Sequence, residues 1–396
     1  MKELSRIASA VQASTTMAID AMFKQMKADG VDVIGFGAGE PDFNTPDNIK
    51  AAGIAAIEQN VTRYTPAAGT VELRQAVCGR MKADYGLEYK PSQVVVSSGA
   101  KHLVYLALRA VVNPGDEVIL PAPYWVSYIE LIKMVGGVPV VVTATEAEHF
   151  KLTAEKLSAA ITPRTKAILL NNPSNPTGMM YDREELEAIA AVCPQADIYV
   201  ISDEIYACLA YDGRTFTSFA SLSADAKERT ILVNGVSKAY AMTGWRIGYA
   251  CANDVIAKVM ANYVSHSTGS PVAISQRAAA VALSGSQAEI ETMRQAFEQR
   301  RNYIVERMNA IPGVSCIQPE GAFYVMMNLE QLLGKTIHGV EITNDDVFAD
   351  AFLKYGLVAV VPGSGFGAPN FVRWSYATSM ENIKEGLDRL EKFLAE

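Results

Sequence analysis

A lysine and an arginine lie eight positions apart in a loop between two apolar runs. Lys238 follows the run at 231–233, and Arg246 precedes the run at 247–251. A loop held between two buried strands is a rigid mount for reactive side chains. Burial and a neighbouring cation both favour the neutral amine of a lysine, which is the nucleophile that forms a Schiff base with an aldehyde. The planar guanidinium of an arginine suits a phosphate group, although the stretch alone fits a surface lysine in a turn equally well.

A carboxylate and a tyrosine follow a third apolar run, at 198–201. Asp203 comes two positions after this run, and Tyr206 three positions later. A buried carboxylate is costly without a cationic partner, and a protonated pyridine nitrogen would supply one. Tyr206 is close enough along the chain to reach the same ligand. The alternative is that Asp203 caps a helix, which is a common role of aspartate.

Two further strand ends carry small or polar residues. One predicted strand gives way to a helix at Gly99, Ala100 and Lys101. Small residues at a helix N-terminus expose free amides that can bind phosphate, although an ordinary strand–helix turn has the same pattern. Another strand leads into an irregular loop with two prolines and a glycine, at 171–178. This loop would present the Asn175 amide rigidly to a ring hydroxyl or a carboxylate.

The elements that must position these residues alternate between short β-branched runs and helical patterns. The predicted strands are 94–96, 118–120, 138–142, 167–170, 198–201, 231–233 and 247–251, with helices at 101–112, 125–135 and 184–192. Such alternation predicts an α/β fold with parallel strands and crossover helices. Because ligands bind outside the carboxyl ends of such strands, the candidate residues are expected to meet at that edge.

The remainder of the chain predicts a second, smaller α+β domain. A helical stretch at 275–310 is broken near 284–286; short strands follow at 321–327, 358–361 and 371–375, and a last helix at 380–394. The N-terminal segment is expected to join this domain, because the sheet pattern starts only after Pro46. We therefore predict a large domain at 46–290 and a small domain, made of 1–45 and 291–396, that closes over the site.

Composition and charge exclude several classes of protein. The net charge of −8 argues against a nucleic-acid binder, which needs a basic face. No run of about 18 uncharged apolar residues indicates a membrane span, and the N-terminus lacks the apolar core of a signal peptide. The five cysteines and four histidines are scattered without a metal-ligand spacing. We therefore expect no bound metal, and reduced thiols in a cytoplasmic protein.

One cofactor matches the combined chemistry. A lysine nucleophile, a carboxylate for a ring nitrogen and a phosphate cradle together specify pyridoxal 5′-phosphate. A nicotinamide site is the rival, because Gly35, Gly37 and Gly39 form part of a dinucleotide fingerprint. The third glycine comes one position early and a proline follows where a helix should begin, which argues against that site. A glycine-rich loop that lets backbone approach a substrate is the better interpretation.

Nearly the whole chain resembles the class I aminotransferases, enzymes with the fold-type I architecture of pyridoxal-phosphate proteins. The motifs that carry the resemblance are Asn172-Pro173-Ser174-Asn175-Pro176-Thr177-Gly178, Asp203-Glu204-Ile205-Tyr206, and Ser237-Lys238 with Gly244-Trp245-Arg246-Ile247-Gly248-Tyr249. The resemblance is closest to bacterial aspartate aminotransferases, whose subgroup carries a segment like Pro123-Tyr124-Trp125-Val126-Ser127-Tyr128. It implies a mixed, mostly parallel sheet flanked by helices, and a homodimer with shared active sites.

The resemblance also assigns roles to single residues. Lys238 matches the Schiff-base lysine that moves the proton, and Asp203 matches the partner of the pyridine nitrogen. The other expected cofactor contacts are Tyr64 of the neighbouring subunit, Gly99, Ala100, Lys101, Trp125, Asn175, Tyr206, Ser237 and Arg246. The expected substrate contacts are Gly39, Trp125, Asn175 and Arg373. Arg373 would hold the α-carboxylate through two hydrogen bonds.

The implied activity is transfer of an amino group from an L-amino acid, aspartate first, to 2-oxoglutarate in two half-reactions. The sequence departs from part of the family at 260–266, where no arginine is present to bind a distal carboxylate. Lys101, Arg109 and the hydroxyls of Thr15 and Thr16 are candidate substitutes. The alternatives are an aromatic or prephenate aminotransferase and a β-lyase on the same scaffold. A non-catalytic effector-binding module is disfavoured because every catalytic position is filled.

Overall fold

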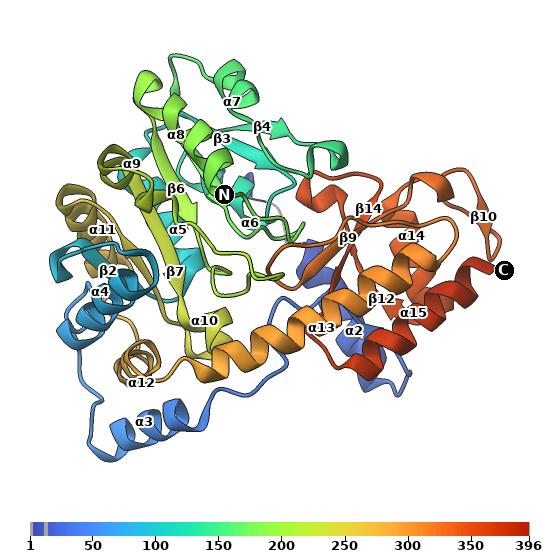
Figure 1. Cartoon of the computed structure of the whole chain (residues 1–396), viewed down its shortest axis with the longest axis horizontal. Helices are drawn as coiled ribbons and strands as arrows, with labels where there is room; N and C mark the ends of the chain where they lie inside the picture. The colour runs from blue at the N-terminus through green and yellow to red at the C-terminus, as the bar shows by residue number, and fades with distance from the viewer. Residues whose placement is uncertain (1–2, 12–14, 396) are drawn as a thin grey trace.

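The larger part of the chain is built on a seven-stranded mixed sheet, seen in a computed structural model that describes residues 3–11 and 15–395 (Figure 1). The strands are β2 (Val94–Ser97), β3 (Glu117–Ala122), β4 (Val138–Thr143), β5 (Thr165–Asn171), β6 (Tyr199–Asp203), β7 (Thr230–Gly235) and β8 (Gly248–Cys251). Their order is β2-β8-β7-β6-β5-β3-β4. Within this described sheet, β8 alone runs antiparallel to its neighbours. The mixed, mostly parallel sheet is confirmed, but the run at 247–251 does not add a parallel strand, because the connection after β7 holds only two short helical turns and no crossover helix.

Helices cover both faces of this sheet. On one face pack α5 (Ala100–Val111), α6 (Ser127–Met134) and α11 (Asp254–Ser267), and on the other α4 (Val71–Tyr85), α8 (Arg183–Ala196) and α12 (Ala273–Ser284). Along β5, for example, Leu169 packs toward the first group whereas Ile168 and Leu170 pack toward the second. Strands buried on both faces are continuous apolar runs, which is why the sequence pattern located them. Helix α11 was not among the predicted helices.

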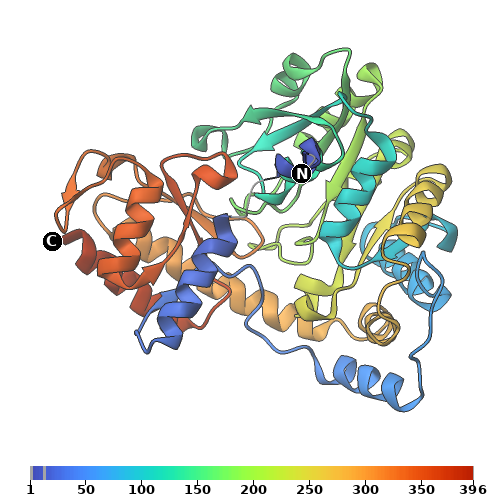
Figure 2. The ribbon, with the colours of Figure 1, turned by 180° about the vertical axis from the view of Figure 1, so that it is seen from behind.

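A second body lies beside the large sheet. Strands β13 (Val361–Pro362), β14 (Phe371–Ser375) and β9 (Tyr324–Asn328) form an antiparallel sheet in that order. The short strand β1 (Ile34–Gly35) pairs in parallel with β12 (Val358–Ala359). The N-terminal segment thus lies against the C-terminal part of the chain, and Figure 2 shows helix α2 (Thr15–Ala28), in blue, packed on this body.

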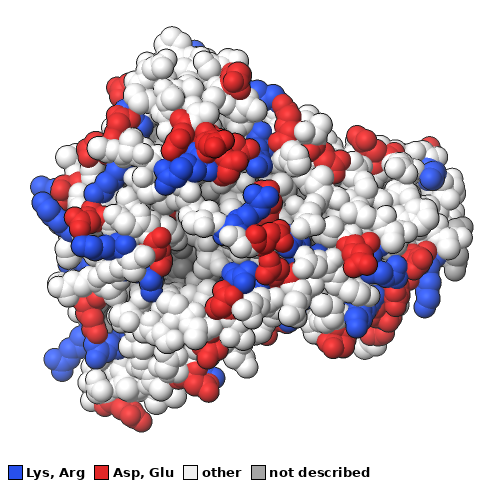
Figure 3. Space-filling model, viewed as in Figure 1, with Lys and Arg blue, Asp and Glu red and all other residues white. Residues whose placement is uncertain are grey.

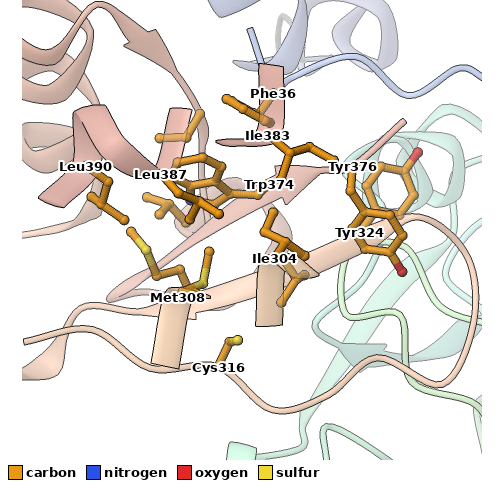
Figure 4. Packing of buried hydrophobic residues seen from close by; sticks show 14 of the residues in the cluster. Phe36, Ile304, Met308, Cys316, Tyr324, Trp374, Tyr376, Ile383, Leu387 and Leu390 are labelled. Atoms are coloured by element: carbon orange, nitrogen blue, oxygen red, sulfur yellow. The ribbon is translucent and has the colours of Figure 1, made fainter. Parts of the chain in front are cut away.

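The second body has its own core. Helices α14 (Asp345–Ala351) and α15 (Met380–Ala395) contribute to it. Figure 4 shows Phe36, Trp374 and Leu387 meeting there, with the rings of Phe36 and Trp374 centred 4.5 Å apart. The N-terminal and C-terminal parts of the chain therefore share one apolar cluster, separate from the clusters that flank the large sheet.

One long helix connects the two bodies. The predicted break at 284–286 is confirmed, since α12 ends at Ser284 and α13 (Ala288–Ala310) begins four residues later. Helix α13 runs from below the large sheet into the second body (Figure 1). The domain boundaries given above stay predictions. Among the described helices, none combines the length and the apolar character needed to cross a bilayer.

Candidate active site

A cavity of about 330 Å³ lies at the carboxyl ends of β5, β6 and β7. The predicted site residues that line it are Gly39, Ala100, Lys101, Trp125, Asn175, Asp203, Tyr206, Ser237, Lys238, Arg246 and Arg373. Its wall also includes Gly37 of the glycine-rich loop, together with side chains to which the sequence pattern gave no role: Tyr128, Asn171, Ile205, Thr243 and Tyr324. The structure therefore brings together residues that are far apart in the sequence, because neighbouring parallel strands end at one edge.

Lys238 stands on a single helical turn directly after β7. This turn, α10 (Val236–Ala239), replaces the irregular loop expected here, because four residues between a strand and a turn are too few to show a helical pattern. The Lys238 ammonium donates to the Gly39 carbonyl. Burial lowers the pKa of Lys238 to about 8, with a further lowering by Arg246 and an opposing effect of Glu40. The neutral amine needed to attack an aldehyde is thus accessible near neutral pH.

Asp203 ends β6 with its carboxylate at the cavity. Its Oδ2 accepts a hydrogen bond from the Tyr128 hydroxyl at 2.7 Å, and its Oδ1 accepts one from the Ile205 amide at 3.2 Å. Burial raises the pKa of Asp203 to about 6, against the opposing effect of these bonds and of Lys238. A protonated ring nitrogen would supply the cation that a buried carboxylate requires.

Tyr128 is a functional residue that the sequence analysis missed. It lies three positions after Trp125, and the two rings meet edge to face with centroids 5.3 Å apart. The signal that could have found it is this spacing at the start of a predicted helix, which places both aromatic side chains on one side. Trp125 thereby faces the cavity while Tyr128 reaches Asp203 behind it.

The N-terminus of α5 forms a cradle at one end of the cavity. Gly99 has a φ of 88°, and a Cβ built on it would lie 2.5 Å from Nη2 of Arg246. A Cβ on Gly248 would lie 2.5 Å from the amide nitrogen of Ala100, so the helix start packs directly on the backbone of β8. Arg246 is held by the Ser98 carbonyl, which accepts from Nη2 at 3.2 Å. Free helix amides beside a guanidinium can bind a phosphate.

A second cationic group faces the cavity from β14. Arg373 is buried; its Nη1 donates to Asn175 Oδ1 and its Nη2 to the Gly37 carbonyl, both at 2.9 Å. Its Nε has no partner among the described residues. The guanidinium lies 4.5 Å from the ring centre of Tyr324, whose hydroxyl is 2.9 Å from that of Tyr206. Since the Asn175 oxygen is engaged, its amide NH₂ is left to donate into the cavity. Tyr324 lies on a predicted strand, and no sequence signal marked its role.

The structure separates the candidates for a distal carboxylate. Lys101 lines the cavity, with its Nζ 4.7 Å from the ring centre of Trp125. Burial, and secondarily Arg246, lower the pKa of Lys101. Arg109 lies two turns further along α5, where it donates to the Tyr263 hydroxyl at 2.9 Å, away from the cavity. The side chains of the remaining candidates lie outside the described residues; these are Thr15 and Thr16.

Tyr64 lies away from the cavity of its own chain. Its side chain is fully exposed, beside a shallow depression formed with residues 268–274. Within the described chain, no contact brings Tyr64 to the cavity wall.

The charges that line the cavity fit pyridoxal 5′-phosphate. The described wall holds the cations Lys101, Lys238, Arg246 and Arg373 and the carboxylate Asp203. The cavity therefore carries an excess of positive charge, although the chain has a net charge of −8. On the outer surface, basic and acidic side chains are interspersed over the face shown in Figure 3. A ligand with a phosphate, an aldehyde and a basic ring nitrogen matches the Gly99 cradle, the lysine and the carboxylate in turn. Within residues 3–11 and 15–395, no group of three or more histidine, cysteine or acidic side chains could hold a metal ion.

Known proteins share this fold and sequence. The family model for class I and II aminotransferases matches residues 31–390. The chain is 49% identical to the aspartate aminotransferase of Bacillus sp. (strain YM-2), covering 100% of both chains, and 47% identical to the aspartate/prephenate aminotransferase of Cereibacter sphaeroides, covering 100% of this chain and 99% of the relative. The structure of Thermus thermophilus aspartate aminotransferase with maleate matches with a TM-score of 0.94 at 41% identity, over 99% of this chain and 100% of that one. The chain therefore belongs to the class I and II aminotransferase family and has the fold-type I architecture of pyridoxal-phosphate enzymes.

Proposed function

We propose that this protein transfers the amino group of aspartate to 2-oxoglutarate with pyridoxal 5′-phosphate as cofactor. The observation that carries the proposal is one cavity that combines a lysine of lowered pKa, a buried carboxylate and two arginines. The relatives named aspartate aminotransferase support the choice of aspartate.

The residues of the cavity divide the work of holding the cofactor. Lys238 would bind its aldehyde, Asp203 would keep a proton on its ring nitrogen, and Arg246 with the first amides of α5 would bind its phosphate. Asn175 and Tyr206 would donate to the ring oxygen. When bound, pyridoxal phosphate withdraws electrons from the α-carbon of an amino acid and so acidifies the α-proton.

Lys238 also serves as the base of the reaction. A neutral amine with a pKa near 8 can accept the α-proton and release it again at neutral pH. The substrate must therefore be held with its α-proton toward this amine. Arg373 would hold the α-carboxylate through two charge-assisted hydrogen bonds, with the backbone at Gly39 beside it.

Lys101 is our choice for the residue that binds the distal carboxylate. It is the candidate cation, among those described, that reaches the cavity, and it lies above Trp125. The Thermus thermophilus relative was solved with maleate, a dicarboxylate of four carbons. Loss of one charge-assisted hydrogen bond costs roughly 1.5–3 kcal/mol. Lys101→Gln should therefore lower kcat/KM for aspartate roughly ten- to hundred-fold and leave that for phenylalanine unchanged.

A second candidate function is amino transfer to prephenate. The Cereibacter sphaeroides relative is named an aspartate/prephenate aminotransferase. Steady-state rates with aspartate, glutamate, phenylalanine and cystathionine as donors, and with 2-oxoglutarate and prephenate as acceptors, separate this activity from the first and from β-elimination. A panel in which aspartate is not used with either acceptor would reject the proposed function.

The covalent role of Lys238 has a direct test. Lys238→Ala should abolish turnover and the absorbance of lysine-bound cofactor, while the protein stays folded. A variant that keeps this absorbance would contradict the assignment of the lysine.

We further propose a homodimer in which each Tyr64 serves the neighbouring site. The exposed Val272 lines the same depression, and Ile54 and Ile57 are exposed on α3 (Asp47–Glu58), which packs on α12; a second copy would cover these side chains. Mixed dimers of Lys238→Ala and Tyr64→Phe subunits test this arrangement. A shared site predicts that half of the sites in such hybrids regain wild-type cofactor affinity, whereas sites built within one chain would regain none.

Two further features of the chain support the remaining expectations. The core shared by 31–45 and 291–396 is distinct from the clusters on the large sheet, apart from residues 205–211 that pack into it, which supports the division into domains 46–290 and 1–45 with 291–396. All five cysteines are free thiols, which supports a reducing, cytoplasmic location.

A further inference from the structure

Glu204, the residue after Asp203, is a carboxyl group to which the reaction gives no role. It is completely buried and does not line the cavity. Its Oε1 accepts three hydrogen bonds, from Ser202 Oγ at 3.0 Å, Ser218 Oγ at 2.9 Å and the Phe219 amide at 3.2 Å. Oε2 has no hydrogen-bond partner, donor or acceptor, among the described residues.

The lack of any donor at Oε2 disfavours a carboxylate at this buried position. A carboxylate carries charge on both oxygens and needs donors at each, whereas an acid has one accepting oxygen and one hydroxyl. A buried carboxylate with no cation beside it is also costly. Burial raises the pKa of Glu204 to about 8, against the opposing effect of its three hydrogen bonds.

The ionisable groups around Glu204 offer it no positive charge. The ionisable groups that interact with it are Asp203, Tyr85 of α4, Tyr89 of the loop after α4, and Cys251 of β8. The nearby cations of α4 and of α9 (Ala224–Arg229) are engaged elsewhere. Arg80 pairs with Asp84 at 2.7 Å, while Lys227 lies 4.8 Å from the ring centre of Tyr89 and donates to the Glu88 carbonyl.

The hydrogen bonds of Glu204 fix the end of β6. They join it to the turn η3 (Phe219–Ser221), and the Glu204 amide donates to the Val233 carbonyl of β7 at 2.8 Å. Because Asp203 is the preceding residue, the same contacts set the position of its carboxylate.

We propose that Glu204 is a neutral carboxylic acid that positions Asp203 and, by remaining uncharged, leaves Asp203 as the single anion behind the cofactor ring. The role of Asp203 in this statement rests on the proposed function, whereas the protonation of Glu204 does not. A second negative charge next to Asp203 would favour protonation of Asp203 and weaken its hold on a ring N–H.

The first test is the pH dependence of unfolding of the apoprotein. A folded-state pKa near 8, above the ordinary value of 4.5, means that the native protein binds this proton more tightly than the unfolded chain. The resulting stabilisation is complete below pH 4.5 and is lost as the pH rises through 8. Between pH 6.5 and 9.5, the unfolding equilibrium constant of the wild type should rise about thirty-fold more than that of Glu204→Gln. Parallel curves for the two proteins would overturn the proposal.

A control variant separates the loss of a hydrogen bond from the loss of a proton, and a second measurement applies if Glu204→Gln does not fold. Ser218→Ala removes a donor that opposes protonation of Glu204, so it should lower stability, and its unfolding should depend on pH at least as steeply as that of the wild type. If Glu204→Gln does not fold, infrared spectroscopy of the wild-type apoprotein decides the matter. The carbonyl stretch of a protonated carboxyl group should be present at pH 7, shift in Ser218→Ala and vanish above pH 8. Its absence at pH 7 would overturn the proposal.

The proposed role of Glu204 in positioning Asp203 is tested by measuring the affinity of the apoprotein for pyridoxal 5′-phosphate by titration, without any amino acid. Glu204→Gln keeps the accepting oxygen, so its cofactor affinity at pH 7 should stay within about two-fold of the wild type. Glu204→Ala loses the contacts to η3, and its affinity should fall about ten-fold. Equal affinities of the two variants would contradict the positioning role. Because no substrate is used, these outcomes do not depend on whether aspartate is the amino donor.

Discussion

The hydrogen bond from Tyr128 to Asp203 favours the ionised form of the Asp203 carboxyl group. Tyr128→Phe removes a hydroxyl that donates at 2.7 Å and leaves the buried ring in place. Losing a hydrogen bond to a buried charge costs roughly 1.5–3 kcal/mol, which equals roughly one to two pKa units. Since the bond favours the charged form, the pKa of Asp203 should rise from about 6 to roughly 7–8.

The expected consequence is a pH-dependent loss of cofactor affinity. At pH 7 the ionised fraction of Asp203 falls from about nine-tenths to between a half and a tenth. If a ring N–H needs the carboxylate, the affinity of the apoprotein for pyridoxal 5′-phosphate drops about two- to ten-fold at pH 7. The difference from the wild type should shrink toward pH 9, where both proteins are ionised. Equilibrium titrations at several pH values measure this.

Tyr124→Phe is the matched control. Tyr124 lies four positions earlier, next to Gly367, and does not line the cavity. This variant should bind the cofactor as the wild type does at every pH. If Tyr128→Phe instead lost affinity by the same factor at pH 6, 7 and 9, the hydrogen bond would act on packing and not on ionisation, and the electrostatic reasoning would be refuted.

Three further changes probe other parts of the cavity. Gly99→Ala places a Cβ 2.5 Å from Arg246 Nη2 at a φ of 88°, so affinity for pyridoxal 5′-phosphate should fall at least about ten-fold while affinity for phosphate-free pyridoxal is kept; equal losses would argue against a phosphate cradle. Arg373→Met should raise KM for every amino donor about a hundred-fold with unchanged cofactor affinity, and a loss confined to dicarboxylates would reassign this residue. The rate at which the apoprotein captures the cofactor aldehyde should rise about ten-fold per pH unit below 8 and level off above it, because burial lowers the pKa of Lys238 to about 8. A rise that continues to pH 10 would mean that the amine is not desolvated.

The sequence correctly places at the cavity those residues that directly follow a strand of the large sheet. Lys238, Asp203 and Asn175 each follow an apolar run, and parallel strands deliver such residues to one edge without any knowledge of packing. Arg373 has no such signal and was assigned by resemblance alone.

The features of the site that the sequence does not predict are those produced by contacts between segments far apart in the chain. Tyr324 reaches the cavity wall through contacts with Tyr206 and Arg373, which come from different elements. The neutral state of Glu204 depends on Ser218 and on the absence of a nearby cation, neither of which a local pattern shows. A local motif reports the residue types, whereas ionisation is a property of the assembled surroundings.

The reversed direction of β8 has a consequence for cofactor selection. Because β8 starts at the edge where β7 ends, the connection at 236–247 leaves the cavity edge and returns to it. Lys238 and Arg246 lie near the two ends of this single connection and would bind the aldehyde and the phosphate, which are neighbouring substituents of the cofactor ring. The conformation of this one connection therefore sets the distance between the group that would bind the aldehyde and the group that would bind the phosphate. A residue inserted or deleted within it would change which ligand length fits, without altering any group that does chemistry.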